Sequence, residues 1–296
     1  MVVSYSASSQ SYFKENAQAM GISHHHVSPD LFGAGVAVFD YDNDGFEDIY
    51  LTGGTLQDVL YRNNQGISFE DITRNVGLGV TSIYHTTAVT YGDINNDGLT
   101  DLFVCTQRGY PNQLFLNRSD GTFRNISISS GVSDSIWSTG ALMADFNNDT
   151  FLDIYVLNYI KEPALLRDAN DSIIGYDHTC YPNKLFINNG DLTFTEQSAE
   201  FQLDNEGCSL SGAALDENAD GLTDLLIVND FGAWVEPNSL MQNSIDYLFV
   251  DIAPDIRLND SIYGMGVALS DLNGDAKSDL YMTNIGDNVL RFSTAD

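Results

Sequence analysis

The sequence predicts an all-β protein, a single β-propeller of five four-stranded blades. One acidic loop pattern, D-x-[DN]-x-D-x-x-x-D, occurs five times in the 296 residues. A short stretch rich in Gly, Ala and Val precedes each copy, and a β-type apolar run follows it, which indicates strand, tight loop, strand. Because a repeat of roughly 50 residues with about four short strands is typical of a propeller blade, the period predicts the fold.

The composition is that of a globular domain with a strongly negative surface. Hydrophobic residues make up 43% of the chain, and 42 acidic against 12 basic side chains give a formal charge of −30. Nucleic acids and anionic lipids are polyanions, so this charge argues against both as partners. No stretch reaches the roughly 18 apolar residues of a membrane span, and no signal peptide is visible at the start. We therefore expect no nucleic-acid partner and no membrane insertion.

The strands of each blade are expected in a fixed order around the acidic loop. The loops span 40–48, 93–101, 145–153, 216–224 and 271–279. The first strand precedes the loop, as in GAGVAVF and GMGVALS, and the second follows it as IYL, LFV, IYV, LLI or LYM. The third recurs as NQLFLN, NKLFIN and NSLMQN, with weaker copies DVLYRN and NVLRFS. The fourth recurs as SFEDITRNVGL and TFRNISISSGV, with weaker copies at Phe194, Phe249 and Phe13.

The order of these strands predicts how the ring closes. The chain begins with a fourth-strand segment at Phe13 that has no first three strands before it, and it ends with three strands, up to Leu290, that have no fourth. Phe13 is therefore expected to complete the fifth blade and to remove its open edge. The predicted domain covers residues 1–296, with an insertion at 158–182. The alternative is a fragment of a seven-bladed propeller cut at a repeat boundary.

The acidic loops are expected to bind metal. Side-chain oxygens at positions 1, 3, 5 and 9, with the backbone carbonyl of position 7, suit a hard cation that takes 6–8 oxygen ligands, and calcium fits better than magnesium. The pattern contains no Cys or His, which argues against zinc and copper. A β run begins directly after position 9, whereas an EF-hand needs Glu at position 12 and flanking helices. Up to five Ca²⁺ ions are predicted, with the ligands Asp40, Asp42, Asp44, Phe46, Asp48, Asp93, Asn95, Asp97, Leu99, Asp101, Asp145, Asn147, Asp149, Phe151, Asp153, Asp216, Asn218, Asp220, Leu222, Asp224, Asp271, Asn273, Asp275, Lys277 and Asp279.

The five loops are not expected to be equal. The first has four ligand carboxylates, whereas each of the others has three and an Asn at position 3, so the first is expected to bind most tightly. Position 6 is Gly in three loops, which indicates a positive φ there. Thr150 and Ala276 occupy that position in the third and fifth loops, at a cost of about 1 kcal/mol or more. The third and fifth loops are therefore the predicted weaker sites.

The repeat resembles a known family. The loop after FGAG (residues 32–35) or YGMG (residues 263–266) is similar to the FG-GAP/VCBS repeat of integrin-α-type propellers. GISHHH, GAGVAVFDYDNDGFEDIYL and NKLFINNGDLTFTEQS resemble the cartilage acidic protein-like branch, which is often linked to an ASPIC/UnbV domain. The resemblance covers nearly the whole chain and implies calcium-binding, usually extracellular propellers in adhesion or ligand recognition. The chain departs from it in having five copies instead of the common seven and no ASPIC/UnbV segment.

The face opposite the acidic loops is the predicted ligand face. All five histidines lie in its connections, and it holds the long insertion. Loops carry function, and concave sites combine aromatic walls with a few polar groups. Eight residues before each loop stand Phe32, His85, Trp137, Cys208 and Tyr263, which are expected to surround the central opening. The candidate ligand-binding residues are His26, His85, Arg108, Trp137, His178, Asp230, Trp234 and Tyr263.

The cysteines bear on the compartment. Cys180 and Cys208 fall in connections of the same face and are candidates for a disulfide that would hold the insertion, while Cys105 is expected to be a buried thiol. The alternative is three free thiols in a reducing compartment. Extracellular calcium modules work at millimolar calcium, and a disulfide needs an oxidising milieu. Both favour an extracellular or periplasmic location.

Three functions are compatible with these features. The first is a non-enzymatic recognition or adhesion module for a glycan or protein ligand. The second is an enzyme with a His and aromatic pocket at the propeller axis, in which His acts as acid or base. The third is a structural subunit of an extracellular assembly, for which a homo-oligomer is an option. No nucleophile elbow or phosphate-binding Gly loop is present, and no catalytic residue is assigned, so the first function is favoured.

Overall fold

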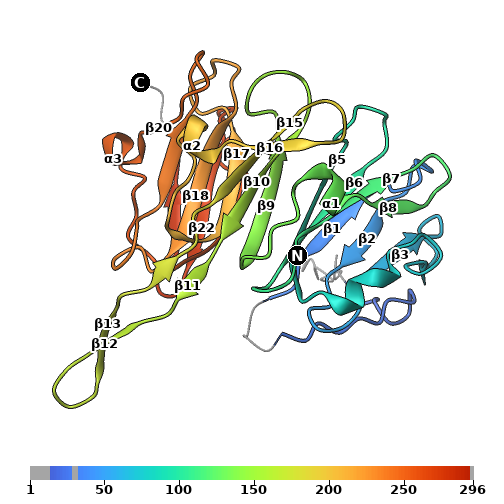
Figure 1. The fold of residues 1–296 in the computed structure, drawn as a ribbon, viewed down its shortest axis with the longest axis horizontal. Coiled ribbons are helices and arrows are strands. Elements are labelled where there is room, and N and C mark those ends of the chain that lie inside the picture. Colours follow the sequence, from blue (N-terminus) through green and yellow to red (C-terminus); the bar gives the residue numbers. More distant parts are fainter. Residues whose placement is uncertain (1–13, 29–32, 294–296) are drawn as a thin grey trace, which may run out of the picture.

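The computed structural model describes residues 14–28 and 33–293 and is nearly all β (Figure 1). Five antiparallel sheets follow one another along the chain as the blades of a propeller, which confirms the predicted fold. Blade one contains β1 (Val36–Phe39), β2 (Asp48–Leu51), β3 (Val59–Asn63) and β4 (Phe69–Asp71). Blade two contains β5 (Thr86–Gly92), β6 (Asp101–Thr106), β7 (Gln113–Asn117) and β8 (Phe123–Asn125).

The remaining blades repeat this order. Blade three contains β9 (Ser138–Ala144), β10 (Asp153–Asn158), β15 (Lys184–Asn188) and β16 (Phe194–Glu196). Blade four contains β17 (Cys208–Leu215), β18 (Asp224–Asp230), β19 (Ser239–Gln242) and β20 (Val250–Asp251). Blade five contains β21 (Gly264–Ser270), β22 (Asp279–Asn284) and β23 (Val289–Arg291). The segment around Phe13, which was expected to complete this blade, lies outside the described residues.

Short helical turns lie in the connections between blades. They are η1 (Gly79–Ile83), α1 (Ser127–Ser130), α2 (Ser198–Phe201) and α3 (Ala253–Ile256). The three α turns directly follow the fourth strands of blades two, three and four and end at a residue with positive φ. Each turn thus redirects the chain from the last strand of one blade towards the first strand of the next.

The predicted insertion is a long arm between β10 and β15. It consists of β11 (Ile160–Glu162), β12 (Leu165–Arg167), β13 (Ile173–Tyr176) and β14 (Thr179–Cys180). β11 pairs with β14 at the base, and β12 pairs with β13 further out, so the arm is a hairpin that projects from the body of the propeller (Figure 1).

Apolar cores lie between consecutive blades. Strand residues alternate between the two faces of a sheet, so one blade contributes to the core before it and to the core after it. In blade two, Phe115 packs towards blade one, whereas Leu114 and Leu116 pack towards blade three. Four such cores join blades one to five in order, and none joins blade five to blade one in residues 14–28 and 33–293. In Figure 1, β1 and β22 accordingly lie on opposite sides of β9 and β10.

Candidate functional site

The acidic loops have the same hydrogen-bonded geometry in every blade. In the first loop, Asp40 accepts hydrogen bonds from the backbone N–H groups of Asp44 (3.1 Å) and Gly45 (2.7 Å). Asp44 in turn accepts one from Phe46 N (3.0 Å). The equivalent first carboxylates make the same two bonds in the other four loops, namely Asp93, Asp145, Asp216 and Asp271. The side-chain oxygens are therefore held on the inner side of a tight turn.

The last carboxylate of each loop is buried and joins the loop to the third strand. Asp48 accepts from Tyr41 N (2.9 Å) within the loop and from Asn63 N (2.7 Å) on β3. Burial raises its pKa to about 6, against these two bonds, and burial likewise raises the pKa values of Asp101 and Asp153 to about 7. The carboxylate at position 9 thus joins the acidic loop to the third strand of the blade. It also offers an oxygen to a cation.

The backbone of the loops is left-handed at two positions. Position 6 has a positive φ in all five loops, including Thr150 (76°) and Ala276 (66°). The expectation drawn from the three glycines is therefore correct, and the two non-glycine residues are strained. Position 4 is left-handed as well, which the sequence analysis missed. Its residues are Asn43, Asn96, Asn148, Ala219 and Gly274, and the frequency of Asn there was the available signal.

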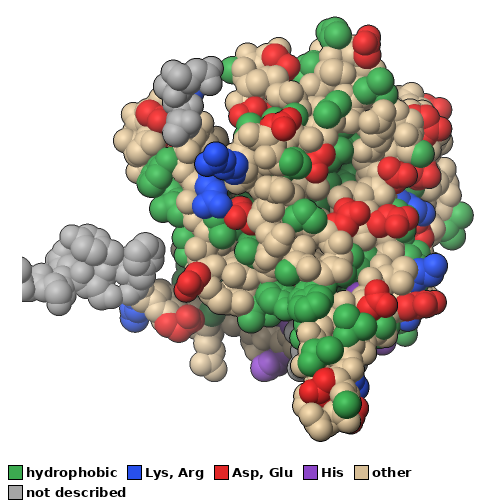
Figure 2. Space-filling view, turned by 90° about the vertical axis from the view of Figure 1, so that its left-hand side faces the viewer, with side chains coloured by type: hydrophobic (Ala, Val, Ile, Leu, Met, Phe, Trp, Pro, Cys, Tyr) green, Lys and Arg blue, Asp and Glu red, His purple; other side chains and the backbone are tan. Residues whose placement is uncertain are grey.

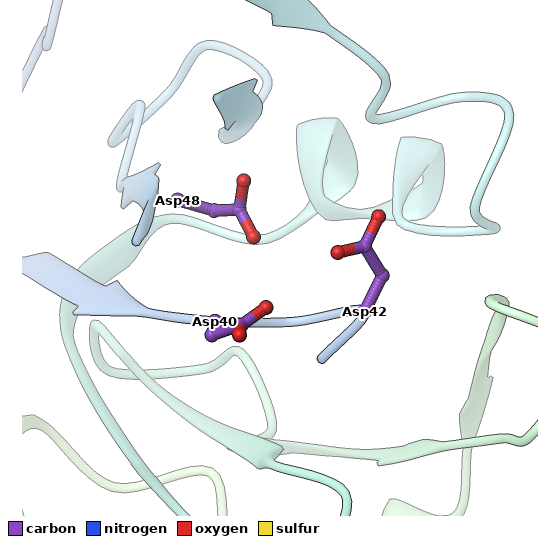
Figure 3. A group of neighbouring side chains, drawn as sticks. All are labelled: Asp40, Asp42 and Asp48. Atoms are coloured by element: carbon purple, nitrogen blue, oxygen red, sulfur yellow. The ribbon is translucent and has the colours of Figure 1, made fainter. Parts of the chain in front are cut away.

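The first loop gathers the most carboxylates. Oxygens of Asp40, Asp42 and Asp48 all lie within 4.8 Å of one another, and Figure 3 shows the three groups pointing towards a common space. Arg62 on β3 lies beside them, with its guanidinium 2.8 Å from Asp42 and 3.3 Å from Asp44. Arg62 was not among the residues predicted from the sequence, and its charge offsets the extra carboxylate of the loop.

The other four loops replace that carboxylate by Asn. In the second loop, Asn95 Oδ1 accepts from Asp97 N (3.1 Å), while Asn95 Nδ2 donates to Asp97 Oδ2 (3.0 Å). The Asn–Asp contact recurs in the third, fourth and fifth loops. All donors in the five sets are carboxylate, amide or carbonyl oxygens on tight turns, which is the chemistry that Ca²⁺ takes. The residues present therefore fit the expected ion.

The predicted ligand-face residues of blades one and two contact other parts of the propeller. His26 bonds the carbonyl of Thr52 through Nδ1 (3.0 Å). His85 stacks on Tyr110 with ring centroids 4.1 Å apart. Arg108 reaches across to blade three, where its guanidinium donates to the carbonyls of Ile160 (3.0 Å) and Lys161 (2.8 Å) at the base of the arm. These contacts give the three residues structural roles. Phe32, which was expected at the opening, is outside the described part of the chain.

Four rings and a histidine meet where the arm leaves the body. This aromatic cluster comprises Tyr176, His178, Phe231, Trp234 and Tyr263. Trp234 Nε1 donates to Tyr263 Oη (3.3 Å), and the ring of Trp234 lies against Gly175, where a Cβ would come within 2.5 Å of it. The side chain of Trp234 is nevertheless 44% exposed. The cluster therefore presents an aromatic surface to solvent on blades three to five.

Hydrogen-bonded polar groups lie next to the aromatic cluster. Asp230 accepts a hydrogen bond from Tyr159 Oη (2.6 Å), and the ring of Tyr159 makes an edge contact with Trp137. Burial raises the pKa of Asp230. His178 Nδ1 accepts from Ala164 N (2.9 Å), and burial lowers the pKa of His178, which favours the neutral ring. Five predicted residues thus come together: Trp137, His178, Asp230, Trp234 and Tyr263.

The disulfide holds this region together. Cys180 on β14 is bonded to Cys208 on β17, with the two Cα atoms 5.3 Å apart, as the sequence analysis expected. Tyr159 and Ile160 pack around it. Cys105 is a buried free cysteine. The bond therefore ties the base of the arm to blade four, next to Phe231.

Sequence reasoning missed Tyr176 and Phe231. Tyr176 lies in the insertion, whose course over blades four and five no repeat predicts. Phe231 directly follows β18 with a positive φ (56°), and its ring centroid lies 4.9 Å from that of Tyr176 and 4.5 Å from that of His178. Figure 2 shows the arm projecting from the body, with acidic side chains spread over the surface around it.

Comparisons with known proteins find a matching repeat family and several relatives. The family described as FG-GAP-like repeat matches residues 40–104 and 93–156, which contain the first three loops. Cartilage acidic protein 1 of Mus musculus is 25% identical over 284 residues, and that of Homo sapiens is 27% identical over 281. These matches cover 87% and 85% of the chain but only 41% and 38% of the relatives' own lengths.

Among solved structures, an Agrocybe aegerita lectin that recognises non-reducing terminal N-acetylglucosamine aligns with a TM-score of 0.48. It is 16% identical, and the alignment covers 88% of this chain and 65% of the lectin. In residues 14–28 and 33–293, no helix has the length and apolar character needed to cross a membrane.

Proposed function

For a chain that carries FG-GAP-like repeats and is related to cartilage acidic protein 1, we propose a calcium-stabilised recognition module that binds a glycan or protein ligand outside the cell. The aromatic cluster carries the recognition part of this proposal, because it joins exposed rings to fixed polar groups. Sites for small ligands combine apolar and aromatic walls with a few polar groups in the same way. The disulfide supports an oxidising compartment.

The five loops carry the calcium part of the proposal. Each brings carboxylates together at one face of the propeller, where they repel one another unless a cation lies between them. Bound calcium would screen this repulsion and tie the first, second and third strands of a blade through the loop. Because a ligand that binds only the folded state stabilises it, a single site at 100 times its Kd adds about 2.7 kcal/mol to the free energy of unfolding.

Thermal unfolding tests the calcium part. EDTA is expected to lower the melting temperature by several degrees, and calcium in excess of EDTA is expected to restore it, whereas magnesium restores less. Asp40→Asn should reduce the calcium-dependent shift, while the matched variant Glu47→Gln, which removes one charge from position 8 of the same loop, should not. A melting temperature that is the same in EDTA and in calcium would refute the calcium sites.

A glycan array tests the recognition part. The chain in calcium is expected to bind a subset of glycans, and Trp234→Ala should reduce that binding at least about tenfold, which corresponds to about 1.4 kcal/mol. Tyr91→Ala is the matched control, since Tyr91 is 45% exposed on β5, away from the aromatic cluster. Equal binding by the Trp234 variant would place recognition elsewhere, and a chain that binds no glycan would contradict the glycan ligand.

A further inference from the structure

The third-strand motifs NQLFLN, NKLFIN and NSLMQN all end in an asparagine that is not a predicted calcium ligand. Asn117 and Asn188 are the last residues of β7 and β15, and Asn243 directly follows β19. All three side chains are buried. Buried amides need hydrogen-bond partners, and the partners of these three lie in the acidic loops of two neighbouring blades.

Asn117 joins the first loop to the second. Its backbone N–H donates to Asp101 Oδ1 (2.7 Å), the carboxylate at position 9 of its own loop. Its side-chain Nδ2 donates to the carbonyl of Tyr41 (2.8 Å), at position 2 of the preceding loop. The N–H of Tyr41 in turn donates to Asp48 Oδ2 (2.9 Å). Tyr41 and Asn117 therefore connect the position 9 carboxylates of the two loops.

The same connection joins the second loop to the third. The N–H of Ile94 donates to Asp101 Oδ2 (3.1 Å), and its carbonyl accepts from Asn188 Nδ2 (2.8 Å). The backbone N–H of Asn188 donates to Asp153 Oδ1 (2.8 Å). Asp101 thus accepts from one connection at Oδ1 and from the next at Oδ2.

A third connection reaches the fourth loop. The N–H of Phe146 donates to Asp153 Oδ2 (2.9 Å), and its carbonyl accepts from Asn243 Nδ2 (3.0 Å). The backbone N–H of Asn243 donates to Asp224 Oδ1 (2.7 Å). One continuous series of hydrogen bonds, the carboxylate series, therefore joins the position 9 carboxylates of the first four loops.

The carboxylate series gives neighbouring loops a reason to order together. Each position 9 carboxylate accepts at both oxygens, so its orientation depends on the peptide group before it and the asparagine after it. A cation that binds the carboxylate fixes this orientation, and with it the carbonyl that holds the next asparagine. Ordering one loop thus lowers the entropic cost of ordering the next. Through space the effect is opposite, because one bound Ca²⁺ repels another.

We propose that the carboxylate series couples the first four calcium loops, so that binding at one loop raises the affinity of its neighbour. The inference rests on the proposed calcium function and adds its regulation. Asn117, Asn188 and Asn243 are positioning residues in it, because they act through the carboxylates that would hold the ions. Coupling between two sites is reciprocal, so each loop of a pair gains by the same factor.

The third and fourth loops give the sharpest test. A second bond joins the earlier loops, since Asn43 Nδ2 donates to the carbonyl of Gly98 (3.0 Å) and Asn96 Nδ2 to that of Thr150 (3.2 Å). Within the described residues no equivalent bond runs from Asn148 to the fourth loop. The boundary between the third and fourth loops therefore tests the carboxylate series alone.

Hydrogen exchange of residues 216–224, followed as free calcium is raised, gives the calcium concentration at which the fourth loop is half protected. Asp145→Asn weakens calcium binding at the third loop, which exchange of residues 145–153 reports in the same experiment. The half-protection concentration of the fourth loop should then rise about fivefold. Repulsion between ions predicts a fall instead, because the field at the fourth loop becomes more negative without the neighbouring Ca²⁺.

Two asparagine variants locate the coupling. Asn243→Ser removes the side-chain amide and keeps the backbone N–H that donates to Asp224. In this background Asp145→Asn should no longer raise the half-protection concentration of the fourth loop. Asn63→Ser is the matched control, because Asn63 ends β3 of blade one and its Nδ2 donates to the carbonyl of Glu47 in its own loop (2.9 Å). The fivefold rise should persist in that background.

The outcomes separate the coupling from the calcium sites. A half-protection concentration that falls or stays the same in Asp145→Asn overturns the coupling, as does a rise that persists in Asn243→Ser. If Asn243→Ser does not fold, the sign of the shift in Asp145→Asn decides. A wild-type chain in which calcium protects none of the loops overturns the calcium part of the proposed function and the coupling with it. Protection of the loops without the rise overturns the coupling alone.

Discussion

Asp58 is a buried carboxylate immediately before the third strand, where the other four blades have Asn. Its Oδ1 accepts from Gly53 N (2.7 Å) and Thr86 Oγ1 (2.6 Å), and its Oδ2 accepts from Tyr50 Oη (2.7 Å). Burial nevertheless dominates and raises the pKa of Asp58. The residue therefore satisfies three donors at the cost of a charge that water no longer solvates.

This charge predicts a pH dependence. The pKa of Asp58 is higher in the folded chain than in the unfolded chain, where it is about 3.9, so the folded state binds the proton more readily. Wild-type stability should rise relative to Asp58→Asn as the pH falls through the folded pKa, and the gain should level off below about 3.9. Urea unfolding of both proteins in calcium measures the difference between their free energies of unfolding. The loop carboxylates are the same in both proteins, so their contribution cancels from this difference. A difference that stays flat or falls on acidification would contradict the prediction.

The two left-handed positions of the acidic loops differ in how well the sequence predicts them. The positive φ at position 6 could be predicted because Gly occupies it three times, and Thr150 and Ala276 then follow by homology of position. Ala219 has a positive φ (60°) at position 4, and nothing in its own identity indicates this. Only comparison with Asn43, Asn96 and Gly274 in the other loops would have shown it.

At the scale of elements, repetition decided what could be predicted. The strands around each loop recur with the same apolar runs, so their order and number followed from the sequence. The disulfide between Cys180 and Cys208 followed from placing both in connections of one face. The arm has no counterpart in the other blades, so its pairing of β12 with β13 and its packing against Phe231 could not be read from any repeat.

The two kinds of candidate site also differ in how far the sequence predicts them, because only one of them is built from repeated segments. The loop ligands are specified by local sequence, because all of them lie within nine residues of one another. The aromatic cluster joins residues from 176 to 263, and its geometry depends on how an unrepeated hairpin contacts blades four and five through Tyr176. The sequence placed Trp234 and Tyr263 on the same face, but their contact with Tyr176 required the structure.

At the scale of the whole molecule, charge and packing act against each other. Four apolar cores hold the five blades in a row, while a formal charge of −30 repels them from one another. The loops concentrate much of that charge at one end of every blade. The electrostatic cost of folding is highest at the acidic loop between the first and second strands of each blade, and any bound cation acts there.

This opposition predicts how salt and calcium combine. Five calcium ions would add ten positive charges and bring the net charge from −30 to −20. In EDTA, raising NaCl from about 0.02 to 0.3 M shortens the Debye length from about 20 Å to about 6 Å and should raise the melting temperature, because repulsion between loops is screened. In saturating calcium the same change of salt should raise it less, since the bound ions have already offset the charge. Potassium chloride serves as the control for an effect specific to sodium. Equal salt dependence with and without calcium would mean that the loops do not set the electrostatic cost of folding.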